Sequence, residues 1–174
     1  MRVLVVGGGI SSEREVSLRS AQAIYDTLIE GKEHEPYLYD WDGTENWLLQ
    51  NVSKFDVVFP ALHGEGGEDG TIQKILEKNN CAFVGSGSSS SKNCIDKTKT
   101  KDVLRQNNIR VPDGKSVSYQ EYLAHRLYNL PHVLKPSIGG SSIDTFIFPS
   151  ISSRIDEEIE QAFTRHKYLL VEEY

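Results

Sequence analysis

The stretch from His63 to Thr71 combines side chains that bind small polar molecules with glycines that let a backbone approach a ligand closely. It holds one histidine, three acidic residues and four glycines, and it directly follows the apolar run 57–62. Glycine takes positive φ without steric cost, and ligands of parallel α/β sheets gather outside the carboxyl ends of the strands. We therefore predict a binding loop at a strand end. Its imidazole suits a carboxylate or proton transfer near neutral pH, although a structural hydrogen bond is an equally good interpretation.

Lys135 and the residues after it form a second candidate site. This lysine ends the apolar stretch 131–134 and precedes residues 136–142, which read Pro-Ser-Ile-Gly-Gly-Ser-Ser. Glycines and hydroxyls suit a loop that closes over phosphate groups, and such loops commonly pair lysine with glycine. On an earlier helical stretch, Lys97 and Lys101 share one face while Lys99 points elsewhere. Charge runs of this kind are more often a solvated surface, so the residue types favour a phosphate role for Lys135 first.

Two acidic residues, Glu13 and Glu15, fall in the first turn of an expected helix that follows the glycines 7–9. The helix dipole stabilises acidic side chains there with or without a ligand, so this position alone assigns no function. Ser12 and Glu15 have the spacing of a capping box, which predicts that Ser12 starts the helix.

Short apolar stretches alternate with amphipathic ones through the first half of the chain, which indicates a βαβαβ order. We expect strands at 3–6, 36–39, 57–59 and 81–84, and helices from Ser12 to Leu28, at 47–52 and at 71–78. Such alternation predicts a parallel sheet covered on both faces. The fold class is therefore α/β, with a Rossmann-like first domain over residues 1–86.

The second half of the chain predicts a smaller domain. Residues 85–91 have the composition of a flexible linker, so we place a linker at 87–95 and a domain at 96–174. In it we expect a helix at 95–107, strands at 115–117, 133–135, 143–148 and 168–172, and helices at 119–128 and from 151. Ile151, Ile155, Ile159 and Phe163 recur every four residues and predict one buried stripe. The result is an α+β unit with two helices on a small sheet.

Composition excludes several classes of protein. The 174 residues are 38% hydrophobic, and no apolar run approaches the roughly 18 residues of a membrane span. The formal charge of −6 argues against a nucleic-acid partner. Residues 92–115 carry seven Lys or Arg and three Asp, a net of +4 that suits a small anionic ligand. We expect no membrane partner and, since the amino terminus lacks a signal-peptide core, a cytoplasmic location.

The cysteines and the remaining histidines carry less information. Cys81 and Cys94 match no metal or redox spacing, and we expect both to be buried thiols. Four histidines besides His63 stand among surface-like residues and form no metal-ligand pair.

Three motifs in order resemble those of the D-alanine:D-alanine ligases of the ATP-grasp superfamily. They are Gly7–Ser17, Ala61–Thr71 and Lys135–Ser142, and Gly85–Gly87 followed by Asp96–Lys97 adds a fourth similarity. The resemblance covers nearly the whole chain and only the amino-terminal half of such an enzyme. It implies a ligase that forms D-alanyl-D-alanine through an acyl phosphate for peptidoglycan synthesis. The second domain would then be the small α+β subdomain of an ATP-grasp fold, truncated.

The resemblance also implies roles for individual residues. Glu13 would hold the ammonium of the first D-alanine, His63 would support its carboxylate, and Val16 would lie beside it. Ser141 joins Glu13 as an implied catalytic residue. The implied ATP-binding residues are Lys97, Lys135, Ser141, Ser142 and Glu172.

By the same resemblance, the magnesium carboxylates and most of the second-substrate pocket belong to the half that follows. We therefore expect ATP and Mg²⁺ as cofactors of the complete enzyme, no metal ligands in this chain, and no activity of the chain alone. D-alanine and ATP are the expected small-molecule ligands, and a homodimer through the first domain is expected because it is common in the family. The alternatives are a non-catalytic small-molecule-binding module and one subunit of a split ATP-grasp ligase.

Overall fold

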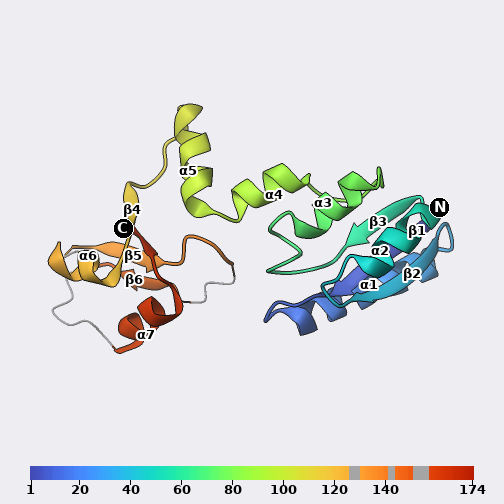
Figure 1. Cartoon of the computed structure of the whole chain (residues 1–174), viewed down its shortest axis with the longest axis horizontal. Helices are drawn as coiled ribbons and strands as arrows, with labels where there is room; N and C mark the ends of the chain where they lie inside the picture. The colour runs from blue at the N-terminus through green and yellow to red at the C-terminus, as the bar shows by residue number, and fades with distance from the viewer. Residues whose placement is uncertain (126–129, 141–143, 151–156) are drawn as a thin grey trace. The chain divides into compact units, whose positions relative to one another are not determined.

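The computed structural model describes residues 1–125, 130–140, 144–150 and 157–174 (Figure 1). The chain divides into two compact units, Met1–Cys94 and Ile95–Tyr174. In the described ranges, no helix combines the length and the apolar character that crossing a membrane requires.

The first unit is built on a parallel sheet, as predicted, with three strands. Its strands are β1 (Arg2–Gly8), β2 (Glu35–Trp41) and β3 (Val57–Pro60), in the order β2-β1-β3. The central strand β1 is buried along almost its whole length, because its side chains meet a helical layer on each face. An uninterrupted apolar run, such as residues 3–6, is what a parallel central strand requires.

Helices cover both faces of this sheet. They are α1 (Arg14–Gly31), α2 (Asn46–Asn51), the 3₁₀ turn η1 (Val52–Lys54) and α3 (Thr71–Lys78). A further helix, α4 (Ser88–Cys94), contacts α3 and has no buried residue. One side of β1 places Val3 and Val5 against Ala21 of α1, and the other places Leu4 and Val6 in a cluster that includes α2 and α3. Gly7 allows α1 to approach closely, since a Cβ there would lie 2.6 Å from that of Ala21.

Two local predictions for the first unit were wrong in detail. Residues 81–84 form no strand; only Phe83 makes a parallel bridge, to Val58. The capping box is also absent: Glu13 is the N-cap residue of α1 and has no side-chain cap bond. The hydroxyl of Ser11 instead accepts the backbone N–H of Glu13 at 3.1 Å, which shifts the helix start by one residue.

The serine-rich stretch predicted as a flexible linker is helical, and α4 spans most of it. Glu77 near the end of α3 accepts the backbone N–H of Ser88 at 2.8 Å and its hydroxyl at 2.5 Å. A carboxylate from another helix therefore satisfies a first-turn amide that α4 cannot satisfy itself. Cys94 at the end of α4 is exposed and Cys81 is half-buried, so the expectation that both cysteines are buried was wrong.

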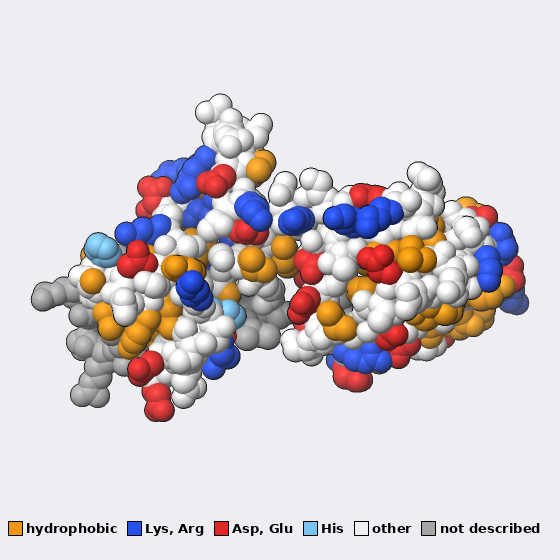
Figure 2. All heavy atoms as spheres, in the orientation of Figure 1, with side chains coloured by type: hydrophobic (Ala, Val, Ile, Leu, Met, Phe, Trp, Pro, Cys, Tyr) orange, Lys and Arg blue, Asp and Glu red, His pale blue; other side chains and the backbone are white. Residues whose placement is uncertain are grey.

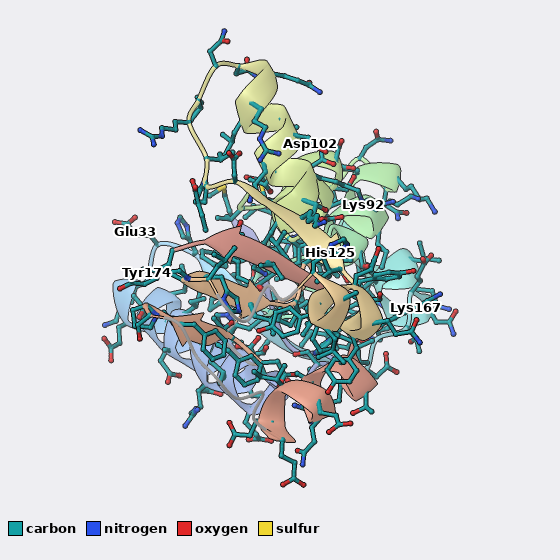
Figure 3. The ribbon with its side chains drawn as sticks, turned by 90° about the vertical axis from the view of Figure 1, so that its left-hand side faces the viewer. Glu33, Lys92, Asp102, His125, Lys167 and Tyr174 are labelled. Carbon is teal, nitrogen blue, oxygen red and sulfur yellow. The ribbon has the colours of Figure 1, made fainter. Side chains whose placement is uncertain are left out.

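In its described residues, the second unit is a four-stranded antiparallel sheet with three helices. Its strands are β4 (Gly114–Val117), β5 (His132–Lys135), β6 (Phe146–Phe148) and β7 (Leu169–Glu173), in the order β4-β7-β5-β6. Its helices are α5 (Lys97–Gln106), α6 (Tyr119–Ala124) and α7 (Glu157–Arg165). Figure 3 looks onto this unit and shows α5 on the side of the sheet away from α7.

The core of the second unit lies between the sheet and the pair α6 and α7. Tyr122, Ile159 and Phe163 pack there against Leu134 and Val171. The predicted stripe of the last helix is thus confirmed for its two described members, while Ile151 and Ile155 lie outside the described residues. The prediction that the histidines other than His63 are surface residues was wrong for His132, which is buried and lies 2.8 Å from the Tyr122 hydroxyl through its Nε2.

Candidate substrate and nucleotide sites

One face of α1 carries the polar residues of the first candidate site. Glu13, Ser17 and Ser20 follow one another at intervals of four and three residues, so they lie on the same side of the helix. The loop that leaves β3 passes over this side and brings His63 to it. The structure therefore brings together Glu13 and His63, which are 50 positions apart in the sequence.

Two serine hydroxyls tie the backbone of His63 to the backbone of Glu13. The Ser11 hydroxyl donates to the His63 carbonyl at 2.7 Å and accepts the Glu13 N–H at 3.1 Å. The fully buried Ser17 hydroxyl accepts the His63 N–H at 2.9 Å and donates to the Glu13 carbonyl at 3.2 Å. Buried hydrogen bonds of this kind fix both residues in one geometry.

The imidazole of His63 lies between a hydroxyl and a carboxylate. Its Nε2 is 3.0 Å from the Ser20 hydroxyl, and its Nδ1 is 3.8 Å from Glu68 Oε1. The His63 side chain is 37% exposed, so it remains accessible to a small molecule. A charged imidazole there can hold a carboxylate, and a neutral one can accept or donate a hydrogen bond.

Glu13 lies close to the glycine loop. Gly64 has φ +72°, and a Cβ on it would stand 3.0 Å from Glu13 Oε2 and from the Ser11 side chain. This left-handed backbone and the tight space explain why glycine follows His63. Val16 lies one turn after Glu13 on α1 and is 39% exposed. A carboxylate, an imidazole and an exposed apolar side chain therefore belong to one local surface.

The second candidate site lies on the sheet of the second unit. Lys135 on β5 is paired with Leu170 on β7, so Glu172 is its diagonal neighbour on the same face. Diagonal neighbours are within reach when both side chains are long, and Lys135 Nζ and Glu172 Oε2 form an ion pair. The buried carboxylate of Glu172 thus orients the lysine that was predicted to meet phosphate.

A second lysine, Lys101 of α5, holds the other oxygen of the same carboxylate. Its Nζ is 2.6 Å from Glu172 Oε1, and it is one of the few buried charged residues in the described ranges. Burial by itself would raise the pKa of Glu172, but hydrogen bonds from Lys101 and Lys135 outweigh it and the pKa is lowered. Glu172 therefore stays ionised as the centre of a lysine pair.

Lys97 begins α5 beside this group and faces the glycine loop. Its Nζ donates to the Gly139 carbonyl at 2.8 Å, and its backbone N–H donates to the Ser137 carbonyl at 2.8 Å. Burial, and then the positive charge of Lys135, lower the pKa of Lys97. An anion placed between these two lysines would relieve their repulsion.

Asp96 fixes the start of this helix and so the position of Lys97. Its side chain accepts the N–H groups of Thr98 and Lys99, and its backbone makes an antiparallel bridge to Ile138. The helix start and the loop after β5 are therefore tied to each other. Figure 2 shows Lys and Arg side chains on the visible face of α5, with acidic side chains among them.

The structure places six of the predicted site residues in two groups. Glu13, Val16 and His63 gather in the first unit, and Lys97, Lys135 and Glu172 gather in the second. Ser141 and Ser142 lie outside the described residues. Five further side chains, which the sequence did not predict as site residues, each form a hydrogen bond or an ion pair with a predicted site residue. They are Ser11, Ser17, Ser20, Glu68 and Lys101.

Spacing offered a signal for three of these five residues. Ser17 and Ser20 repeat the helical interval from Glu13, and Lys101 shares a face with Lys97. No group of three His, Cys, Asp or Glu side chains that could hold a metal ion occurs in the described ranges, which are 1–125, 130–140, 144–150 and 157–174.

The sequence and the fold of the chain are similar to those of known ligases. A family profile described as "D-ala D-ala ligase N-terminus" matches residues 49–86. The D-alanine–D-alanine ligase of Clostridium botulinum (strain 657 / Type Ba4) is 38% identical over 177 residues, which cover 100% of this chain and 58% of the relative. The chain is similar along its whole length to the amino-terminal part of D-alanine–D-alanine ligases.

Solved structures of ligases confirm the expected fold class. The D-alanine–D-alanine ligase of Bacillus anthracis complexed with ATP gives a TM-score of 0.80 at 30% identity, over 100% of this chain and 58% of that one. The VanG D-Ala:D-Ser ligase of Enterococcus faecalis gives 0.71 at 27% identity, over 99% and 62%. The parallel sheet and the small α+β unit therefore resemble the corresponding part of these ligases, and the chain spans less than two thirds of the length of these relatives.

Proposed function

We propose that this chain supplies the first D-alanine site and the phosphate-binding lysines of an ATP-dependent D-alanine–D-alanine ligase. In this proposal ATP phosphorylates the carboxylate of the first D-alanine, and the amine of a second amino acid attacks the resulting acyl phosphate. The product, D-alanyl-D-alanine, serves peptidoglycan synthesis.

The observation that carries the proposal is the double serine link between Glu13 and His63. A free amino acid is a zwitterion, so its recognition needs an acceptor for the ammonium and a donor for the carboxylate. Glu13 offers the first and His63 the second, and Ser11 and Ser17 hold both to one backbone geometry. Val16 supplies apolar surface one turn along α1.

The lysine group of the second unit supports the nucleotide part of the proposal. The ammonium groups of Lys101 and Lys135 pair with the single carboxylate of Glu172, and the charge of Lys97 interacts with that of Lys135, so positive charge remains for an anion. Preorganised cations of this kind stabilise the charge that develops on a transferring phosphoryl group. In the proposed site, Lys97 and Lys135 contact the phosphates, while Glu172 acts through the lysines that it holds.

Other parts of the expectation stay predictions. Ser141 and Ser142 remain proposed phosphate-loop residues. The described residues offer no set of carboxylates for magnesium, so no step through the metal is assigned to this chain. A homodimer through the first unit and a cytoplasmic location are proposed with the function.

Ligand-induced changes in melting temperature test the amino-acid site. D-alanine is expected to raise the melting temperature of the parent chain, and Glu13→Ala or His63→Ala is expected to remove this rise. Glu15→Ala is the matched control, because it removes an exposed carboxylate from the same helical turn. Equal rises in the parent and in all three variants would contradict the proposed pocket.

A further inference from the structure

Lys101 is a buried cation that the proposed reaction does not use directly. Its side chain and that of Glu172 are each 8% exposed, and its Nζ lies 2.6 Å from Glu172 Oε1. The Lys135 side chain, which holds the other oxygen of Glu172, is 24% exposed. Of these two lysines, Lys135 therefore has the more exposed side chain.

The number of lysine partners of Glu172 decides how much of the positive charge of Lys135 is compensated. When Lys101 satisfies Oε1, Glu172 needs only one further ammonium, and Lys135 supplies it through Oε2. If a neutral residue replaces Lys101, Lys135 becomes the remaining ion-pair partner of Glu172 in the pair described above. An unpaired buried charge is costly, so Lys135 must then compensate the whole charge of Glu172. Lys135 would then be drawn inward and its charge compensated before an anion arrives.

We infer that Lys101 is a positioning residue for nucleotide binding: it neutralises Glu172 and so leaves the charge of Lys135 available to a phosphate group. This inference rests on the proposed function, because it concerns the same phosphate site. Lys101 touches no ligand in it. The helix α5 places Lys97 and Lys101 one turn apart, so one element sets both the direct and the indirect contribution.

Binding of ATP, tripolyphosphate and adenosine to the full chain tests this inference. Lys101→Met is expected to weaken the binding of ATP and of tripolyphosphate about tenfold, because the charge-assisted contact between Lys135 and phosphate is lost. The affinity for adenosine is expected to stay unchanged. Lys101→Arg is expected to restore most of the loss because it keeps the charge. A general structural defect would instead weaken all three ligands together, and that result would overturn the inference.

Two further variants keep the test decisive. Lys99→Met removes the same charge from the exposed side of the same helix and is expected to leave all three affinities unchanged. Lys101→Gln keeps a hydrogen-bond donor for Glu172 and serves if the methionine variant does not fold. Its expected ATP affinity lies below that of the parent and of Lys101→Arg, and parent-like affinity would count against the role of the charge.

The positions of the side chains can also be tested without nucleotide. NMR of the ligand-free chain should show the Glu172 carboxyl titrating at higher pH in Lys101→Gln than in the parent, and the Lys135 ammonium resonances moving. If the parent binds no ATP, the proposed function fails, and these resonances still decide whether Lys101 neutralises Glu172 and leaves the charge of Lys135 uncompensated. Unchanged Glu172 and Lys135 signals would overturn it.

Discussion

Lys101 Nζ and Glu172 Oε1 lie 2.6 Å apart with both side chains 8% exposed, so each residue compensates the charge that the other buries. Removing one partner of a buried pair leaves an unpaired charge and costs about 3–5 kcal/mol. The second lysine on Glu172 reduces this cost, and we predict that Lys101→Met lowers the free energy of unfolding by about 3 kcal/mol.

Urea denaturation at pH 7 measures this change. The exposed Lys99→Met variant is the control, and its free energy of unfolding is expected to stay within about 0.5 kcal/mol of the parent. If the two methionine variants were equally stable, the Lys101–Glu172 contact would not form in solution.

The lowered pKa of Glu172 predicts how stability depends on pH. Burial opposes ionisation, yet the two lysines lower the pKa below that of an unfolded glutamate, about 4.3. The contribution of Glu172 is then fully present above that value and is lost as the pH falls through the folded-state pKa. We predict that Glu172→Gln is less stable than the parent at pH 7 and that the difference shrinks below about pH 4.

Urea denaturation of the parent and Glu172→Gln at several pH values between neutral and acid measures the difference. Glu173→Gln, at the exposed neighbouring position, is the control and should show a much smaller difference at neutral pH. A difference between parent and Glu172→Gln that stays constant down to acid pH would mean that Glu172 is not held as an ion.

Most of the secondary structure was predictable because periodicity reports burial. The alternation of short apolar strands with helices gave the parallel sheet, and α3 was predicted with its observed bounds, Thr71–Lys78. The errors fall where a distant contact decides the conformation. Glu77 supports α4 through Ser88, and Ser11 bonds the His63 carbonyl instead of leaving the helix start to Ser12.

The candidate sites were predictable in their principal residues and less so in the residues that support them. Glu13, His63, Lys97 and Lys135 stand in glycine-rich or helix-start contexts that are visible in the sequence, and the family resemblance gave them roles. Lys101 has no such context, because its importance comes from meeting Glu172, 71 positions away. A contact between distant segments is a property of the fold and leaves little trace in local sequence.

Ser20 offers a test of how the His63 imidazole is held. Its hydroxyl is 3.0 Å from His63 Nε2, and one neutral hydrogen bond contributes about 0.5–1.5 kcal/mol. We predict that Ser20→Ala weakens D-alanine binding by about threefold to tenfold, because the imidazole is less well oriented. Calorimetric titration measures the affinity. Thr27→Ala, on an exposed part of α1, should have no effect, and a parent-like Ser20→Ala would remove Ser20 from the site.

Lys135 tests the nucleotide part of the account. Its ammonium group is expected to contact phosphate, so Lys135→Met should abolish most of the rise in melting temperature that ATP produces. Lys115→Met removes an exposed strand lysine from the same sheet and is the matched control. An equal ATP-induced rise in Lys135→Met and in the parent would contradict the proposed role.

The most direct test of the proposed function is an NMR titration of the full chain with D-alanine, because chemical shifts detect even weak binding. We predict that D-alanine perturbs the backbone amides of Glu13, His63 and Gly64, and that L-alanine at the same concentration does not. Amide signals that are unchanged by D-alanine, or that respond equally to both enantiomers, would contradict the assignment of this surface as the first D-alanine site.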